Sequence, residues 1–172
     1  MQLTSLQYMD GAARRAVPFG LTLILMLFAL TPTYVPGLSD VTPMLTLMSV
    51  YFWSIYRADL LGYGAIFGIG VLEDLLMGTP LGSGALVLLL CQRFVVHQQK
   101  FFYSKPFVVT WMAFAVIALG AAIIRWLCVG FVASSGFTPF GSLLIAYLIS
   151  VAIYPLVAWV LAKTQMKLLA DI

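Results

Sequence analysis

Few side chains in this sequence could carry out acid–base or metal chemistry. The 172 residues include six Asp and Glu and one histidine. His97 stands beside Arg93 and Lys100 in a polar segment, which predicts a solvated or headgroup-level side chain rather than a catalytic or metal-binding one. Cys91 and Cys128 each lie inside an apolar segment, where an isolated thiol is usually a small packing residue. We therefore expect no metal site and no cofactor.

Familiar catalytic motifs are also missing from the sequence. It contains no G-x-S-x-G elbow, no H-E-x-x-H and no P-loop. Ser134 and Ser135 lie in a glycine-containing segment, but no base is within sequence reach of them. We therefore predict no catalytic residue and expect that the protein is not an enzyme.

The segment 62–84 is the most informative part of the chain. It reads GYGAIFGIGVLEDLLMGTPLGSG, with glycine recurring where an apolar helix could use leucine. Two sets of residues are spaced by four: Gly64 and Gly68, then Gly70, Asp74 and Gly78. This spacing predicts a slowly drifting stripe of small residues and one carboxylate, suited to close approach of another helix.

Asp74 needs compensation, because a carboxylate at the centre of a bilayer costs about 2.5–3.5 kcal/mol. We expect its neighbour Glu73 at headgroup level. Arg125 is a candidate partner: at about 1.5 Å per residue, Asp74 and Arg125 lie roughly 21 and 27 Å along their helices, a mismatch within an arginine's reach. This predicts an ion pair between Asp74 and Arg125. The alternative is that Asp74 caps the turn at 78–82 while Arg125 extends alone to the outer headgroups.

The composition indicates the elements that must position these residues. Hydrophobic residues make up 63% and charged residues 9%, against roughly 45–50% and about 25% in soluble domains. So few polar side chains cannot coat a globule, and most of the surface must face lipid. We predict an all-α integral membrane protein with a single transmembrane helical domain over residues 1–172. Six apolar segments are the expected spans: 16–35, 41–56, 60–77, 81–96, 107–131 and 140–162.

The distribution of Lys and Arg predicts the orientation of the spans. Eight of these residues fall at one face if both termini are cytoplasmic: Arg14, Arg15, Arg57, Arg93, Lys100, Lys105, Lys163 and Lys167. Arg125 alone then lies in the outer half, and five spans would break this pattern. The cations flank spans one or two at a time, which indicates contact with the lipid bilayer and no nucleic-acid partner.

The segment 62–84 resembles the MreD family of rod shape-determining proteins. Members of that family carry an aromatic and glycine-rich span that runs into an Asp and then a Pro-Leu-Gly turn. The matching residues are Phe67, Gly70, Leu72, Asp74, Leu75, Gly78, Pro80, Leu81 and Gly82. Pro43 and the segment 51–57 also fit the family pattern. The pair Leu72-Glu73 departs from it, because the family more commonly has a purely apolar pair before the Asp.

The resemblance implies a non-catalytic scaffold of the bacterial elongation complex in the inner (cytoplasmic) membrane, involved in cell shape and lateral-wall peptidoglycan synthesis. Implied partners are the bitopic protein MreC and the cytoskeletal and wall-synthase components of that complex, with no small-molecule ligand. The implied structural or partner motif is Phe67, Gly70, Asp74, Gly78, Pro80, Leu81 and Gly82. The family is also thought to share its fold with substrate-binding subunits of energy-coupling-factor vitamin transporters. A role as such a subunit is therefore the alternative function.

Overall fold

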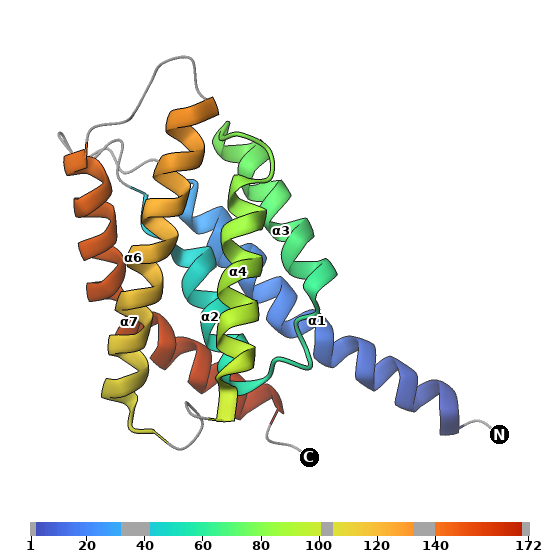
Figure 1. The fold of residues 1–172 in the computed structure, drawn as a ribbon. Coiled ribbons are helices and arrows are strands. Elements are labelled where there is room, and N and C mark those ends of the chain that lie inside the picture. Colours follow the sequence, from blue (N-terminus) through green and yellow to red (C-terminus); the bar gives the residue numbers. More distant parts are fainter. Residues whose placement is uncertain (1–2, 32–41, 101–104, 133–139, 170–172) are drawn as a thin grey trace.

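The structure, a computed structural model, describes residues 3–31, 42–100, 105–132 and 140–169. Over these ranges the chain forms six main helices and no strand (Figure 1). The helices are α1 (Leu3–Ala29), α2 (Leu45–Tyr56), α3 (Tyr63–Met77), α4 (Ser83–His97), α6 (Phe107–Val132) and α7 (Phe140–Leu169). Each of the six apolar segments predicted from the sequence contributes one helix. The all-helical fold class is therefore confirmed.

The helices differ in their capacity to cross a bilayer. The segments Phe107–Val132 and Phe140–Met166 are long and apolar enough to span a membrane. α2 has 12 residues and α3 and α4 have 15 each, so they are roughly 18–22 Å long against about 30 Å of hydrocarbon. Six complete crossings therefore remain a prediction. Figure 1 also shows α7, which contains Pro155, changing direction along its length.

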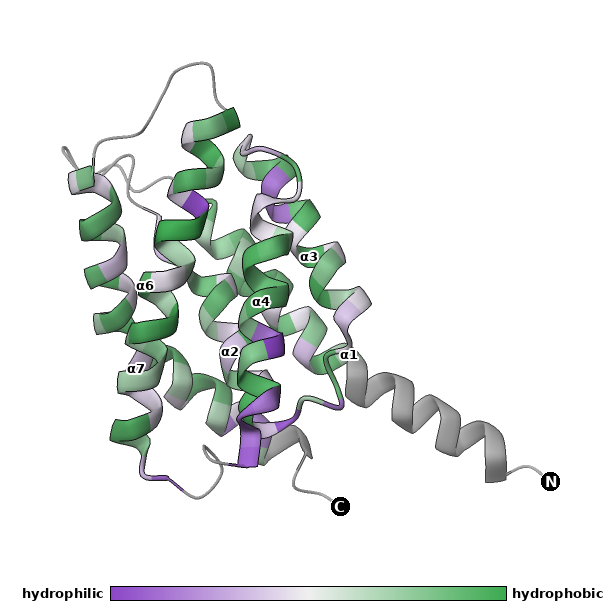
Figure 2. Cartoon of the chain, viewed as in Figure 1, coloured by the Kyte–Doolittle hydropathy of each residue, from purple (hydrophilic) through white to green (hydrophobic). Residues whose placement is uncertain are grey.

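The surface of the described chain is unusually apolar, and several polar side chains are buried beside the hydrophobic core. Large apolar side chains such as Val116, Leu156 and Phe28 are exposed. Figure 2 shows that hydrophobic residues predominate along the helices. Asp74 and Gln92 are buried. Burying polar groups among helices while apolar groups face outward suits a hydrocarbon surrounding.

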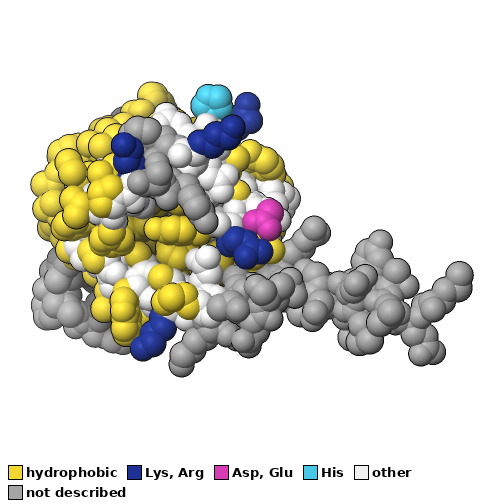
Figure 3. Space-filling view, turned by 90° about the horizontal axis from the view of Figure 1, so that it is seen from below, with side chains coloured by type: hydrophobic (Ala, Val, Ile, Leu, Met, Phe, Trp, Pro, Cys, Tyr) yellow, Lys and Arg dark blue, Asp and Glu magenta, His cyan; other side chains and the backbone are white. Residues whose placement is uncertain are grey.

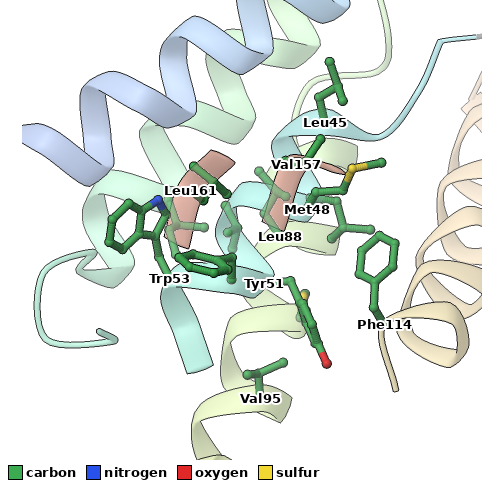
Figure 4. Close-up of a cluster of buried hydrophobic side chains, with 14 of the residues drawn as sticks. Leu45, Met48, Tyr51, Trp53, Leu88, Val95, Phe114, Val157 and Leu161 are labelled. Atoms are coloured by element: carbon green, nitrogen blue, oxygen red, sulfur yellow. The ribbon is translucent and has the colours of Figure 1, made fainter. Parts of the chain in front are cut away.

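The core forms around α2, where all residues from Leu45 to Ile55 are buried. α2 packs against α1, α4 and α7. The Tyr51 ring lies near the Phe114 ring (Figure 4), with 5.3 Å between their centroids. The centroid of the Tyr154 ring lies 5.8 Å from that of Tyr51. Its hydroxyl donates to the carbonyl of Thr110 on α6 at 2.8 Å. This central helix fixes the frame against which α3 and α4 stand.

α1 begins and α7 ends at the same end of the bundle (Figure 1). α2 and α4 end there and α6 begins there, as the figure also shows. Viewed from below, this end carries Lys and Arg side chains around its edge (Figure 3). This arrangement agrees with the expected grouping of both termini with the basic residues. The cytoplasmic side assigned to that end remains a prediction.

Candidate functional site

The candidate site is the α3–α4 hairpin, and two glycines allow its helices to approach closely. A Cβ added to Gly70 would lie 2.3 Å from the Cα of Ala85 on α4. A Cβ added to Gly84 would lie 2.7 Å from Oδ1 of Asp74. The Ala85 backbone cannot yield at such a distance, so a larger residue at position 70 would force the helices apart. A larger residue at position 84 would instead displace the Asp74 carboxylate. The two glycines therefore allow the start of α4 to lie against the carboxylate on α3.

Gly64 and Gly68 have a different environment from Gly70. Both are exposed, and a Cβ on either would meet nothing within 4 Å. The spacing predicted one stripe of small residues with Asp74, but in the structure these residues lie on two different faces of α3. Gly70 and Asp74 face α4, whereas Gly64 and Gly68 face outward.

Asp74 is fully buried and caps the start of α4. Its Oδ1 accepts from the Thr79 hydroxyl at 2.8 Å, the Ser83 hydroxyl at 3.1 Å and the Gly84 N–H at 2.9 Å. Its Oδ2 accepts from the N–H groups of Gly82 at 2.8 Å and Gly84 at 3.0 Å. The first N–H groups of a helix lack partners within the helix and carry a partial positive charge, so a carboxylate is well placed there.

The turn between the helices makes this cap possible. Gly78 ends α3 with φ 66°, and Gly82 precedes α4 with φ 96°, both in the left-handed region that favours glycine. The backbone N–H groups of Gly78 and Thr79 both bond to the carbonyl of Asp74. Asp74 therefore anchors the turn through its backbone as well as its side chain.

Glu73 forms the ion pair that we had predicted for Asp74. Arg125 Nη1 donates to Glu73 Oε1 at 2.9 Å, and Nη2 lies 3.3 Å from the sulfur of Met77. Glu73 is only 5% exposed. The expected Asp74–Arg125 pair is therefore corrected to Glu73–Arg125, and the expected headgroup-level position of Glu73 is wrong. The capping alternative for Asp74 agrees with the structure.

The physical reason is the rotation between neighbouring residues. Consecutive helix positions differ by only about 1.5 Å in depth but by about 100° in direction. Asp74 therefore points to α4 and Glu73 to α6, at nearly the same depth. Figure 2 shows the corresponding hydrophilic patches on α3 and α6 near one end of the bundle.

A small cavity of about 20 Å³ lies between Glu73, Arg125 and the start of α2 at Met44 and Leu47. A volume of this size accommodates about one water molecule, whereas small-molecule pockets usually measure about 300–1,000 Å³. The part of the chain that the structure describes holds no group of three metal-binding side chains. Nothing here supports the alternative of a vitamin-binding subunit.

The remaining motif residues face outward or shape the turn. Phe67 and Leu81 are 52% and 68% exposed, while Pro80 lies in the turn, where its carbonyl accepts from the Ser83 N–H at 3.1 Å. His97 and Cys91 lie elsewhere, His97 exposed at the basic end and Cys91 buried in the core. Ser134 and Ser135 lie outside the described residues.

The sequence did not reveal the donors that surround Asp74. Thr79, Ser83 and Gly84 supply three of its hydrogen bonds. One signal could have indicated them, namely an Asp followed within ten residues by glycines and small hydroxyl residues at the start of a new helix.

Comparison with known proteins identifies a family. A family model described as rod shape-determining protein MreD matches residues 13–164, which is most of the chain. The search of curated proteins gave no match, and neither did the search of solved structures.

Proposed function

This chain belongs to the rod shape-determining protein MreD family, and from that premise we propose that it is a non-catalytic membrane scaffold of the bacterial elongation complex. In this role it holds a bitopic MreC-like protein and the cytoskeletal and wall-synthase components together during lateral-wall peptidoglycan synthesis. We place it in the inner (cytoplasmic) membrane as a multi-pass protein with both termini inside. The family match over residues 13–164 is the observation that carries this proposal.

The chemistry of the hairpin supports a scaffold. Asp74 accepts bonds from four residues of its own hairpin, and Glu73 is engaged by Arg125. Carboxylates used in this way stabilise a fixed shape. A rigid hairpin that exposes apolar side chains is suited to presenting a surface to other membrane segments.

The motif residues divide into an inward and an outward group. Gly70 and Asp74 face α4, and we propose that they maintain the hairpin. Phe67 and Leu81 are exposed, and we propose that they contact the MreC-like partner.

Variants of these residues can separate the two roles. Phe67→Ala and Leu81→Ala should reduce capture of the partner without lowering the melting temperature of the purified protein. Gly70→Ala should lower both. Met112→Ala is the matched control, because Met112 is similarly exposed (65%) on α6, and it should change neither. If Met112→Ala also lost capture of the partner, or if Phe67→Ala and Leu81→Ala kept it, the proposed contact surface would be refuted.

Depletion tests the function itself. Rod-shaped cells that lose the protein should become round, and a fluorescent D-amino acid should no longer label the lateral wall while septal labelling continues. Capture from native membranes should recover the MreC-like protein and wall synthases. Normal cell shape after depletion, together with recovery of an ATPase-containing transporter module, would contradict the scaffold.

The orientation can be tested with two engineered cysteines at opposite ends of α4. In a variant lacking the native cysteines, Leu81→Cys should react with a membrane-impermeant thiol reagent added outside, and Gln98→Cys should not. Both native side chains are exposed in the structure, so a difference in labelling reports the side of the membrane. Labelling of Gln98→Cys from outside would show that the orientation is the opposite of the one proposed.

A further inference from the structure

The outward face of α4 changes from apolar to basic along its length. Leu86 and Leu90 are 45% and 50% exposed, and Arg93 and His97 are exposed further along. At about 100° per residue, these four positions fall within roughly 60° of each other around the helix axis. They therefore form one continuous strip, and Lys100, also exposed, follows it three residues later.

Among the described residues, the basic end of this strip has no partner side chain. Over the described ranges, the side chains of Arg93, His97 and Lys100 make no hydrogen bond or ion pair. Figure 3 shows His97, the single histidine, at the edge of this end beside Lys and Arg side chains. Other cations differ: Arg57 pairs with Asp59 at 3.4 Å, and Lys163 lies 4.7 Å from the ring centroid of Trp159.

We propose that this α4 strip (Leu86, Leu90, Arg93, His97 and Lys100) is a docking site for one anionic phospholipid. The phosphate lies at the basic end and an acyl chain follows the leucines. Arginine suits phosphate because its planar guanidinium can donate two parallel hydrogen bonds. Basic clusters at the cytoplasmic ends of transmembrane helices attract anionic headgroups.

The apolar half of the strip favours lipid over an acidic protein segment. A water-soluble acidic segment would match the charges but leave Leu86 and Leu90 without a partner. A phospholipid matches both parts in the order in which they occur along the helix. The competing explanation is that Arg93 and His97 only complement the carbonyl groups at the end of α4, and this explanation requires no bound lipid.

Native mass spectrometry of the purified full chain can test the site. The protein is mixed with equal amounts of phosphatidylglycerol and phosphatidylcholine, and the wild type should retain phosphatidylglycerol preferentially. The variant Arg93→Gln/Lys100→Gln should bind it about 25-fold more weakly, at about fivefold for each cation. The control Arg57→Gln/Lys163→Gln removes two charges from the same end of the protein and should change binding less than about twofold.

Three results would overturn the site. An equal loss of phosphatidylglycerol binding in both double variants would show that the lipid responds to the overall surface charge and not to this site. The absence of a phosphatidylglycerol preference in the wild type would favour an acidic protein segment or the carbonyl-complementing role. Displacement of the lipid by millimolar inorganic phosphate alone would show a simple anion site. If the double variant aggregates, Arg93→Gln and Lys100→Gln tested singly should each weaken binding about fivefold, and an unchanged affinity in both would contradict the proposal.

Discussion

Asp74→Asn should destabilise the protein although it changes only one atom of the side chain. Every partner of the carboxylate is a donor, with hydroxyl or N–H groups on both oxygens. An asparagine replaces one oxygen with an NH₂ group. Placed at Oδ2, that group would face the Gly82 N–H, which lies 2.8 Å from this oxygen. Placed at Oδ1, it would face the Gly84 N–H at 2.9 Å. Neither amide orientation satisfies all the donors.

The magnitude follows from these bonds. A hydrogen bond to a charged group contributes about 1.5–3 kcal/mol, and a buried donor left without an acceptor costs about 1–3 kcal/mol. Removing the charge of a fully buried carboxylate offsets part of this loss. We therefore expect the free energy of unfolding to fall by about 2–4 kcal/mol. At about 2–4 °C per kcal/mol for a chain of this size, the melting temperature should drop by roughly 5–15 °C.

The buried thiol of Cys91 offers a built-in reporter for this measurement. Cys91 is 5% exposed, so a thiol-reactive fluorophore should label it only as the bundle opens. The second thiol is removed by Cys128→Ser in all variants. Asp59→Asn is the matched control, because that side chain is 66% exposed and forms an ion pair with Arg57 at 3.4 Å. It should change stability by less than about 0.5 kcal/mol. Equal melting temperatures for Asp74→Asn and Asp59→Asn would refute the capping argument.

Two further substitutions test the rest of the hairpin. Glu73→Gln and Arg125→Gln should each lower the free energy of unfolding, measured by thermal unfolding. The loss in the double variant should be about 1–3 kcal/mol smaller than the sum of the two single losses. Strictly additive losses would contradict the ion pair of 2.9 Å. Gly70→Ala should cost about 1–3 kcal/mol because its Cβ would lie 2.3 Å from the α4 backbone, whereas Gly64→Ala should be neutral or stabilise the helix by up to about 1 kcal/mol. Equal effects of the two alanines in thermal unfolding would show that the close helix approach is not needed.

The helices could be predicted from the sequence because each is a separate apolar run bounded by Pro, Gly or polar residues. The expected span 107–131 and the helix Phe107–Val132 differ by one residue. The main discrepancies are at the chain ends, where α1 begins at Leu3 and α7 continues to Leu169. Apolar content predicts where lipid contact begins, but a helix can continue beyond the hydrocarbon because its backbone bonds are internal.

The site could be predicted only in part, and Glu73 and Asp74 show why. The depth argument correctly selected Arg125 as the cation that reaches a carboxylate on α3. It could not distinguish Asp74 from Glu73, because adjacent residues differ little in depth and are separated by about 100° of rotation. Choosing between them requires the position of α4 around α3, which is set by Gly70 meeting Ala85.

That packing also explains why two adjacent carboxylates can both be buried in one short helix. Asp74 is stabilised by the backbone dipoles and hydroxyl groups at the start of α4, and Glu73 by the full charge of Arg125 on α6. Each therefore has its own compensation on a separate helix. If Gly70→Ala shifts α4 away, Asp74 should lose its partners while the Glu73–Arg125 pair remains. The variant Gly70→Ala should therefore reduce the additional destabilisation caused by Asp74→Asn, but leave the coupling between Glu73 and Arg125 unchanged. If the Asp74→Asn penalty were the same in both backgrounds, α4 would not depend on Gly70 for its position against the carboxylate.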